Sequence, residues 1–390
     1  MHTAWGLRQD FIGGTERFLI DLAKELRTFG FDAFVVCSNM QPEIEVEGVK
    51  VIGRVPESFQ EEFRSSDPNI AEFMRSAVYR DTASAQSLRN VSNYVEEQLQ
   101  GIDADILHLN AFSAAVYFET DRPLVVTNHE NELELDRFWG EGSFATMVEL
   151  IRSDPKALGS TDRLFTPSHH YAGKYTLELG RKIEANPLGT DLQRFGRLGR
   201  KTHSADRTVL VPSRFFPGQK GQDVALSACR LLKDEGHTRF KFLFTGVREY
   251  YLSEVEKFRD DARALQVEDA VTIKSFASMD EAYQQTDIVV SPERYCSYGL
   301  SITESLASGR PTVLTRIPTY LEIARRFPHA HFVPVDDPSA LAKAIVAADN
   351  QTDTETASIL FRLNNDFRSC AERYARTYLD LLGVDGSTEK

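Results

Sequence analysis

The chain has 390 residues, of which 42% are hydrophobic and 26% charged, and its formal net charge at pH 7 is −13. This length allows two domains, each with a complete hydrophobic core. The acidic excess argues against non-specific nucleic-acid binding and against an anionic membrane surface as the main partner.

The cysteines favour a reduced, cytoplasmic protein. There are four of them, and they are scattered without a C-x-x-C pair: Cys37, Cys229, Cys296 and Cys370. Such usage is typical of a compartment in which disulfides do not form. No apolar run approaches the ~20 residues of a membrane span, and no signal peptide is recognisable, which also favours the cytoplasm.

The N-terminal half begins with a glycine loop and a helix. Gly13-Gly14 leads into a segment whose apolar residues recur with helical spacing, and Gly30 is placed to end that helix. Only a few residues precede the loop, so we expect the first strand to be very short or to be missing from the start. Further strands are predicted at 31–36, 49–53, 105–110, 124–128, 163–167 and 183–185, with helices at 84–98 and 144–151.

The pattern restarts after a basic, Gly-rich linker at 196–206. Asp223 is predicted to cap the next helix, which stops at Gly236. Strands are predicted at 208–212, 240–246, 271–273, 287–291, 311–315 and 331–335, and a terminal helix at about 354–382. The alternation predicts two α/β domains with doubly wound parallel sheets. We place the N-terminal domain at 1–195 and the second at 207–364.

The stretch from Ser291 to Pro311 carries the main site. A short apolar strand leads through Gly299 into a helix, and Ser301 and Glu304 have the spacing of a capping box. A strand, a glycine turn and a free helix N-terminus form a site for anions. In an open α/β sheet this place is also the expected ligand crevice.

Two basic residues follow the first strand of the second domain. Arg214 and Lys220 flank Pro217 and Gly218, and this loop should share one sheet edge with Gly299. Together with the helix N-terminus they could hold a diphosphate. They could equally be solvated surface cations. Glu304 is likewise open: it either closes the capping box or accepts hydrogen bonds from the two hydroxyls of a ribose.

Other polar residues carry weaker signals. His129 follows the strand at 124–128, where it could contact a bound hydroxyl or be a structural group. His169 and His170 are adjacent and lack a third ligand at zinc spacing, so we predict no metal site. Asp103 and Asp105 match a D-x-D pattern, but they precede their strand and more simply end a helix or turn.

The order of these motifs resembles glycosyltransferase family 4 of the GT-B fold, across essentially the whole chain. The motifs are the Gly13-Gly14 loop, VVTNH ending at His129, DRLFTPS, NPLGTD, RFFPGQKG and the stretch from Ser291 to Pro311. The resemblance implies two Rossmann-like domains facing across a cleft, with the final helix at about 365–383 packing back on the first. It also implies retaining transfer of a sugar from a nucleotide diphosphate-sugar, most simply a UDP-sugar, without a cofactor or metal.

The same resemblance implies roles for individual residues. His129, Arg214 and Lys220 take part in catalysis: His129 contacts the donor sugar, and the two cations hold the diphosphate. The donor-binding residues are Gly13, Gly14, Arg214, Lys220, Cys296, Gly299, Leu300, Ser301 and Glu304, with Glu304 at the ribose.

One position departs from the family pattern, which is Glu, seven residues, Glu. Cys296 stands eight positions before Glu304, and Glu293 is three residues too early to replace it. The sugar contact is therefore in doubt, while the nucleotide site is intact. Cys296 could admit a less hydroxylated sugar, fill space beside a backbone contact, or mark lost activity.

Rival functions remain open at this point. A phosphorylase or epimerase on the same fold is one alternative, and a non-catalytic binding protein for nucleotide-sugars or carbohydrates is another. We expect the acceptor site in 54–100 and 130–152. These segments lack a basic amphipathic helix, so we expect a small-molecule or oligosaccharide acceptor and no membrane association.

Overall fold

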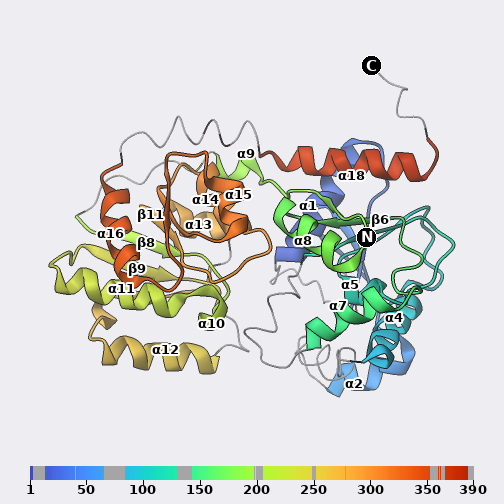
Figure 1. Cartoon of the computed structure of the whole chain (residues 1–390), viewed down its shortest axis with the longest axis horizontal. Coiled ribbons are helices and arrows are strands. Elements are labelled where there is room, and N and C mark those ends of the chain that lie inside the picture. Colours follow the sequence, from blue (N-terminus) through green and yellow to red (C-terminus); the bar gives the residue numbers. More distant parts are fainter. Residues whose placement is uncertain are drawn as a thin grey trace. The chain divides into compact units, whose positions relative to one another are not determined.

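The computed structural model describes residues 1–2, 14–39, 41–65, 84–129, 143–196, 198, 205–247, 252–276, 278–351, 359, 361 and 365–384. The chain forms two compact units, each shown in Figure 1. The first comprises Met1–Leu188 with Arg368–Lys390, and the second Gly189–Phe367. The first unit thus ends before residue 195, where we had placed the boundary. Gly13 and most of the expected linker lie outside the described residues.

The first unit is built on short, mostly parallel strands. Those described are β1 (Val35–Cys37), β2 (Glu43–Val46), β3 (Val49–Gly53), β4 (Leu107–Leu109), β5 (Leu124–Thr127), β6 (Arg163–Thr166) and β7 (Glu184–Ala185). One group of strands has the order β1-β3-β2. In the other group, β4, β5, β6 and β7 pair with one another in chain order. His2 forms parallel bridges to Val36 and Leu109, which places it where the first strand was expected, and residues 3–13 lie outside the described residues.

Strand β2 was not predicted. It pairs antiparallel with β3 through a tight turn at Glu47 and Gly48, whose φ angles are 49° and 81°. Its sequence, EIEV, is half acidic, and its residues are mostly solvent-facing, so it lacks the apolar run of a buried strand. A two-residue turn with positive φ values holds it at the sheet edge.

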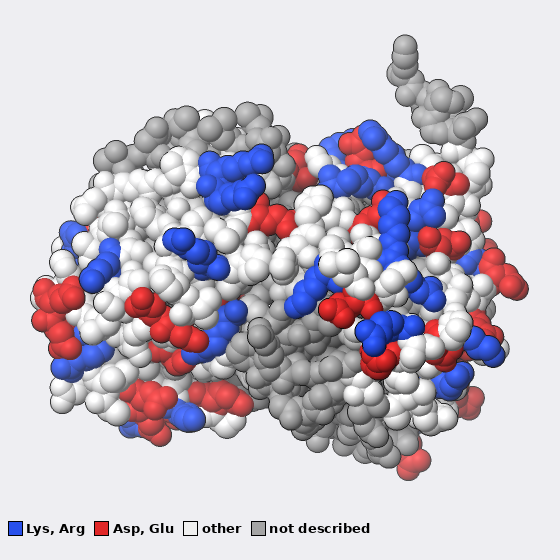
Figure 2. Space-filling model, viewed as in Figure 1, with Lys and Arg blue, Asp and Glu red and all other residues white. Residues whose placement is uncertain are grey.

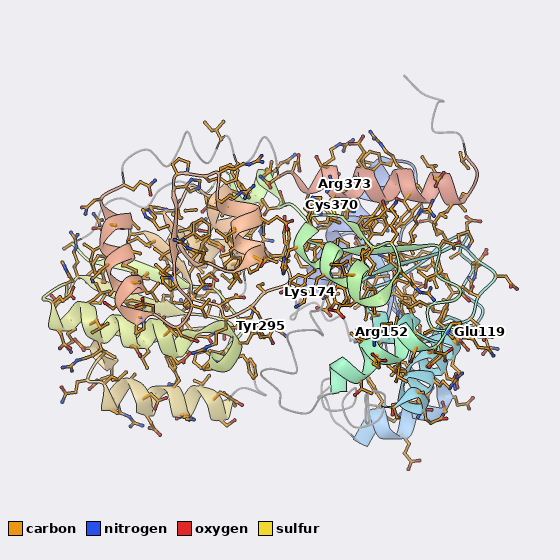
Figure 3. The ribbon with its side chains drawn as sticks, viewed as in Figure 1. Glu119, Arg152, Lys174, Tyr295, Cys370 and Arg373 are labelled. Carbon is orange, nitrogen blue, oxygen red and sulfur yellow. The ribbon has the colours of Figure 1, made fainter. Side chains whose placement is uncertain are left out.

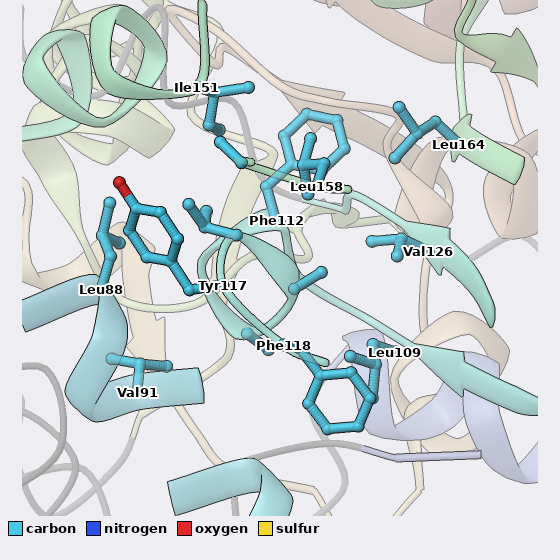
Figure 4. Packing of buried hydrophobic residues seen from close by; sticks show 14 of the residues in the cluster. Leu88, Val91, Leu109, Phe112, Tyr117, Phe118, Val126, Ile151, Leu158 and Leu164 are labelled. Atoms are coloured by element: carbon cyan, nitrogen blue, oxygen red, sulfur yellow. The ribbon is translucent and has the colours of Figure 1, made fainter. Parts of the chain in front are cut away.

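The described helices of the first unit include the three segments that we predicted as helical, namely the one after the glycine loop and those at 84–98 and 144–151. They are α1 (Gly14–Thr28), η1 (Glu57–Phe59), α2 (Gln60–Ser65), α4 (Ala85–Leu99), α5 (Phe112–Ala115), α7 (Ser143–Ser153) and α8 (His169–Leu179). Phe18, Leu22 and Leu26 of α1 are buried, and Gly30 has the positive φ of a C′ residue. Figure 4 shows part of the core, where Phe112 and Phe118 pack among aliphatic side chains from α4, β4 and β5.

The last described helix, α18 (Phe367–Leu381), packs in the first unit. The Tyr374 hydroxyl lies 2.8 Å from Thr127 Oγ1, and the Tyr378 hydroxyl 2.6 Å from His108 Nδ1. Arg373, labelled in Figure 3, donates from Nε to Asn186 Oδ1 at 2.5 Å. Most of the predicted helix before Phe367 lies outside the described residues.

The second unit is a six-stranded parallel sheet in the order β10-β9-β8-β11-β12-β13. The strands are β8 (Arg207–Val211), β9 (Phe240–Phe244), β10 (Val271–Ile273), β11 (Ile288–Ser291), β12 (Thr312–Thr315) and β13 (Ala330–Val333). The chain runs from β8 outward to β10 and then returns to the other side of β8 at β11. The direction of strand addition therefore reverses between β8 and β11, which is where open α/β sheets bind ligands.

Helices cover this sheet, and nine segments of the described residues are assigned to them. They are α9 (Leu192–Phe195), α10 (Pro217–Lys220), α11 (Gln222–Asp234), α12 (Leu252–Ala264), η4 (Glu268–Ala270), α13 (Met279–Gln284), α14 (Leu300–Ala307), α15 (Pro318–Ala324) and α16 (Pro338–Asp349). Helices α11 and α16 pack against one another, as do α14 and α15 (Figure 1). In the described part of the chain, none of the helices has both the length and the apolar character that crossing a bilayer requires.

The predicted cap at Asp223 is wrong. Helix α11 starts at Gln222, and its N-cap is Gly221, with φ 68° and no side-chain cap. A Cβ on Gly221 would overlap the Pro292 carbonyl oxygen, so only glycine fits this close approach. Asp223 instead accepts a hydrogen bond from Arg294 at 2.7 Å.

Candidate functional site

Two loops meet at the carboxyl ends of β8 and β11. The Arg294 amide donates to the Gln219 carbonyl at 2.9 Å. The Arg294 guanidinium donates to the Pro217 carbonyl at 2.7 Å and pairs with Asp223. The pKa of Arg294 is raised, chiefly by its hydrogen bond to Asp223. Arg294 therefore fastens the loop that carries Lys220 to the loop that follows β11.

The centre of this junction is an ion pair. Lys220 Nζ lies 2.8 Å from Glu293 Oε2, and the two side chains are 11% and 2% exposed. Ser213 donates from Oγ to Glu293 Oε1 at 3.3 Å. Removing charges from water is costly, so such a pair persists only with close geometry and added hydrogen bonds. Here both conditions are met.

Glu293 is the residue that sequence reasoning placed outside the site. It stands three positions before Cys296, which is too early along the chain for the family pattern. The side chain of Glu293 reaches Lys220 from its own position in the chain, because β8 and β11 are neighbouring strands. The available signal was its position at the carboxyl end of a buried strand, where functional polar groups gather.

Arg214 lies in the same loop as Lys220 but is exposed. Its carbonyl accepts a hydrogen bond from Gln222 Nε2 at 2.7 Å, which fixes the backbone before α11. A Cβ on Gly246 would overlap the Ser213 carbonyl, so the loop after β9 packs closely beneath this one. The predicted cations thus differ: Lys220 is buried and paired, whereas Arg214 extends to the surface.

Cys296 is buried beside this pair. The side chain is 8% exposed, and burial raises the pKa of its thiol to about 12. A neutral thiol at physiological pH is a poor nucleophile. The Cys296 carbonyl accepts a hydrogen bond from Thr319 Oγ1 at 2.9 Å, so its backbone is held by α15.

The capping box predicted at Ser301 and Glu304 is wrong. Helix α14 starts at Leu300, and its N-cap is Gly299, with φ 102° and no side-chain cap. A Cβ at Gly299 would lie 2.8 Å from the Tyr320 ring, so this turn requires glycine. The first N–H groups of the helix have no intrahelical partners and present the positive end of its dipole.

Without a capping role, Glu304 has another environment. The Tyr283 hydroxyl lies 3.2 Å from Glu304 Oε2 and 2.8 Å from the Ser301 carbonyl oxygen. Burial raises the pKa of Tyr283 well above its ordinary value, so the phenol is a donor. Glu304 is half-buried on the first turn of α14. One carboxylate oxygen is thus oriented by Tyr283, and the ribose contact stays a prediction.

The remaining predicted residues belong to the first unit. Gly14 opens α1, and His129 follows β5. His129 Nε2 lies 3.0 Å from Asn110 Oδ1, and its ring centroid lies 4.5 Å from that of Phe18 on α1. Burial lowers the pKa of His129 to about 3, so the ring is neutral. Asn110 follows the neighbouring strand β4 and was not singled out from the sequence.

The metal prediction concerns His169, His170 and the D-x-D motif. The histidines begin α8, and Asp103 and Asp105 lie in the loop before β4. Among the described residues, no three His, Cys, Asp or Glu side chains are grouped as metal ligands.

On the face shown in Figure 2, acidic and basic residues are interspersed over the described surface.

Two family models match consecutive parts of the chain. Residues 12–194 match "Glycosyltransferase Family 4", and residues 206–349 match "Glycosyl transferases group 1". The boundary between the two matches falls in the segment that we predicted as a linker.

Three known proteins illustrate the similarity. The GDP-mannose:cellobiosyl-diphosphopolyprenol alpha-mannosyltransferase of Xanthomonas oryzae pv. oryzae is 28% identical over 207 residues, which are 50% of this chain and 52% of that protein. The match thus spans about half the relative's length. Sucrose-phosphate synthase from Thermosynechococcus elongatus has a TM-score of 0.74 at 16% identity, covering 95% of this chain and 94% of that one. Anabaena Alr3699/HepE in complex with UDP-glucose has a TM-score of 0.69 at 16% identity, covering 96% and 98%. These structural matches show the fold, which is that of GT-B glycosyltransferases.

Proposed function

Because the chain belongs to the glycosyltransferases of group 1 and family 4, we propose that it transfers a sugar from a nucleotide diphosphate-sugar to an acceptor hydroxyl. The observation that carries this proposal is the edge of the second sheet at β8 and β11. There Lys220, paired with Glu293, supplies donor hydrogens, and Arg214 and the N-terminus of α14 supply positive charge, at the place where open α/β sheets bind ligands. A diphosphate has the charge and size that such a group of donors recognises.

In this proposal the charges act on the leaving group. As the bond between sugar and diphosphate breaks, negative charge grows on the diphosphate oxygens. Lys220 Nζ carries three donor hydrogens, and the bond to Glu293 uses one of them. The others, with Arg214 and the first N–H groups of α14, stabilise the departing group, which is the largest electrostatic contribution expected. Glu304 would then accept the ribose hydroxyls.

We assign retention and metal independence to the same proposal. The cations of the β8 loop take the part that a metal would otherwise play at the diphosphate, so no metal is assigned a role. The buried, neutral thiol of Cys296 is unsuited to form a covalent intermediate. The acceptor hydroxyl would therefore attack from the side of the leaving group and give its proton to the diphosphate.

The donor is proposed to be a UDP-sugar. The Anabaena structure is a complex with UDP-glucose, whereas the name of the Xanthomonas relative specifies GDP-mannose. A GDP-sugar is consequently the alternative donor. The same relative's name specifies a diphosphopolyprenol acceptor. A lipid-linked acceptor therefore stands beside the small-molecule or oligosaccharide acceptor that the sequence favoured.

The experiment is calorimetric titration of the protein with UDP, GDP, ADP and CDP. We expect micromolar binding of one nucleotide, weakened about 10- to 150-fold by Glu304→Ala, because a hydrogen bond to a charged group is worth about 1.5–3 kcal/mol. Lys220→Ala should weaken it similarly. Lys343→Ala, an exposed lysine on α16, is the matched control and should have no effect.

Turnover is tested next with sugar conjugates of the nucleotide that binds. Release of free nucleoside diphosphate, with a product whose anomeric configuration matches the donor in NMR spectra, would support retaining transfer. Binding without turnover on a panel of soluble and lipid-linked acceptors would favour the non-catalytic alternative. If the folded protein binds none of the four nucleotides, the proposed function is wrong.

A further inference from the structure

The amide of Asn110 links β4 to the histidine after β5. Asn110 is 6% exposed, and its Nδ2 donates to the His2 carbonyl at 3.1 Å and lies 3.5 Å from the His108 carbonyl oxygen. Its Oδ1 lies 3.0 Å from His129 Nε2. Strands β4 and β5 are parallel neighbours, so these two side chains leave the same edge of the first sheet.

These contacts allow only one orientation of the amide. Both backbone partners are carbonyl oxygens, which accept hydrogen bonds and cannot donate them. If the amide were reversed, its oxygen would face these acceptors with no hydrogen between them. The amide nitrogen therefore faces the carbonyls of His2 and His108, and the amide oxygen faces His129.

The orientation of the amide fixes the proton on His129. An amide oxygen only accepts, so His129 Nε2 must donate. A neutral imidazole carries one N–H, which leaves Nδ1 with a lone pair. The ring is neutral because burial lowers its pKa to about 3. Its other described contact, the ring of Phe18 at 4.5 Å, supplies no charge that would favour a second proton.

We propose that Asn110 is a positioning residue that holds His129 as the Nε2–H tautomer, so that Nδ1 accepts a hydrogen bond from a hydroxyl group of the donor sugar. The identity of that hydroxyl as a sugar group rests on the proposed function; the tautomer does not. In this arrangement His129 cannot act as a proton donor toward the sugar. It selects for a hydroxyl at this place, because a fluorine or hydrogen substituent has no proton to give.

The first test uses the protein alone, with its histidines labelled with 15N. Two-bond 15N–1H correlation spectra distinguish protonated from unprotonated ring nitrogens. The chain has nine histidines, so the signals of His129 are assigned by comparison with His129→Gln. We expect a protonated Nε2 and an unprotonated Nδ1 at pH 7. A protonated Nδ1 would overturn the proposal, whether or not the protein binds a nucleotide.

Two variants of Asn110 separate positioning from mere support of the fold. Asn110→Asp keeps the acceptor and adds a charge, so the Nε2–H should persist while the pKa of His129 rises toward its ordinary value. Asn110→Leu is similar in size and removes the acceptor, so the ring should populate both tautomers. If the folded Leu variant keeps the wild-type tautomer, Asn110 does not set it.

Kinetic and binding measurements on Asn110→Leu separate an effect on the donor sugar from an effect on the nucleotide. Asn110→Leu should lower kcat/KM for the nucleotide-sugar about tenfold or more, because the Nε2–H group of the half-buried His129 loses its acceptor. Its Kd for the free nucleoside diphosphate should stay within about twofold of the wild-type value. Donors with fluorine at the contacted position should react equally slowly with wild type and variant. A fluorinated donor that still distinguishes them would overturn the acceptor role of Nδ1.

Discussion

Both units place polar side chains at the carboxyl ends of neighbouring parallel strands, but they treat charge differently. In the first unit, Asn110 and His129 form a neutral hydrogen bond, and burial keeps the imidazole unprotonated. In the second, Lys220 and Glu293 form an ion pair with little exposure to water. A neutral pair holds its geometry without needing a charged partner. A buried ammonium, in contrast, can be shared with an anionic ligand.

The largest effect should follow from breaking the ion pair of the second unit. Glu293→Gln leaves the Lys220 ammonium buried without its counter-charge, so we expect a loss of about 3–5 kcal/mol in the free energy of unfolding. Urea unfolding at pH 7 measures it. The double variant Lys220→Met/Glu293→Gln should recover part of this loss. Equal losses in the single and double variants would mean that the unpaired ammonium of Lys220 is not the source of the loss.

Replacing the charged Lys220 of the second unit should lower the turnover rate more than replacing the neutral His129 of the first unit. Lys220→Met is expected to lower kcat by about 100- to 1000-fold, the usual effect of removing one preorganised electrostatic group. His129→Gln keeps a neutral acceptor and should cost about tenfold or less, as for one uncharged hydrogen bond. Rates are measured with saturating donor in variants whose far-UV spectra match the wild type. The reverse ranking would contradict the assignment of roles.

Acid should weaken the first unit more than the second. The pKa values of His2 and His129 are lowered by burial to about 4 and about 3, and that of His108 lies well below its ordinary value. In the second unit, the pKa of His329 is lowered to about 4. Below pH 6.5 the unfolded chain binds protons that the folded chain does not, so stability falls as pH falls.

The expected size of this effect is about 2 kcal/mol per buried histidine between pH 7 and pH 5, at about 1.36 kcal/mol per pKa unit. Hydrogen exchange, corrected for the intrinsic effect of pH, reports each unit separately. Peptides from β4 and β5 should lose more protection than peptides from β8 and β11. Equal losses in both sheets would show that the buried histidines of the first unit do not govern its acid stability.

The smallest effect concerns the glycine that begins α14. Gly299→Ala introduces a Cβ against the Tyr320 ring at a φ of 102°, whereas Gly236→Ala has positive φ but no atom within 4 Å. We expect the first to cost about 1–2 kcal/mol more than the second, through steric strain. Thermal unfolding measures both. Equal melting temperatures would mean that Tyr320 moves aside freely.

Strands with buried faces could be predicted closely from the sequence, because apolar runs such as those of β5 and β11 mark them. The starts of α11 and α14 could not. At α11 and α14 a glycine with positive φ takes the N-cap, and the Asp223 and Ser301 signals that we followed belong to residues inside the helices. The spacing of polar side chains along the sequence can predict only N-caps that those side chains form. The N-caps of α11 and α14 are glycines because another segment of the chain lies too close to their backbone for a Cβ.

Sequence reasoning could name only those candidate site residues that a local motif marks, and their roles stay predictions. The motifs singled out Lys220 and His129, but not the hydrogen-bond partners of these residues, Glu293 and Asn110. Each partner follows the strand that neighbours the one preceding Lys220 or His129, 73 or 19 residues away along the chain. Which strands are neighbours is a property of the sheet order, and spacing within one segment does not contain it.

The hydrogen bonds of α18 have a consequence for the order in which this protein is made. Tyr374 and Tyr378 complete the buried polar network around Thr127 and His108, yet they are translated after the whole of the second unit. Domains usually fold in the order in which they leave the ribosome. Here the second unit is fully synthesised before α18 emerges, so the first unit to be translated is the last to be completed.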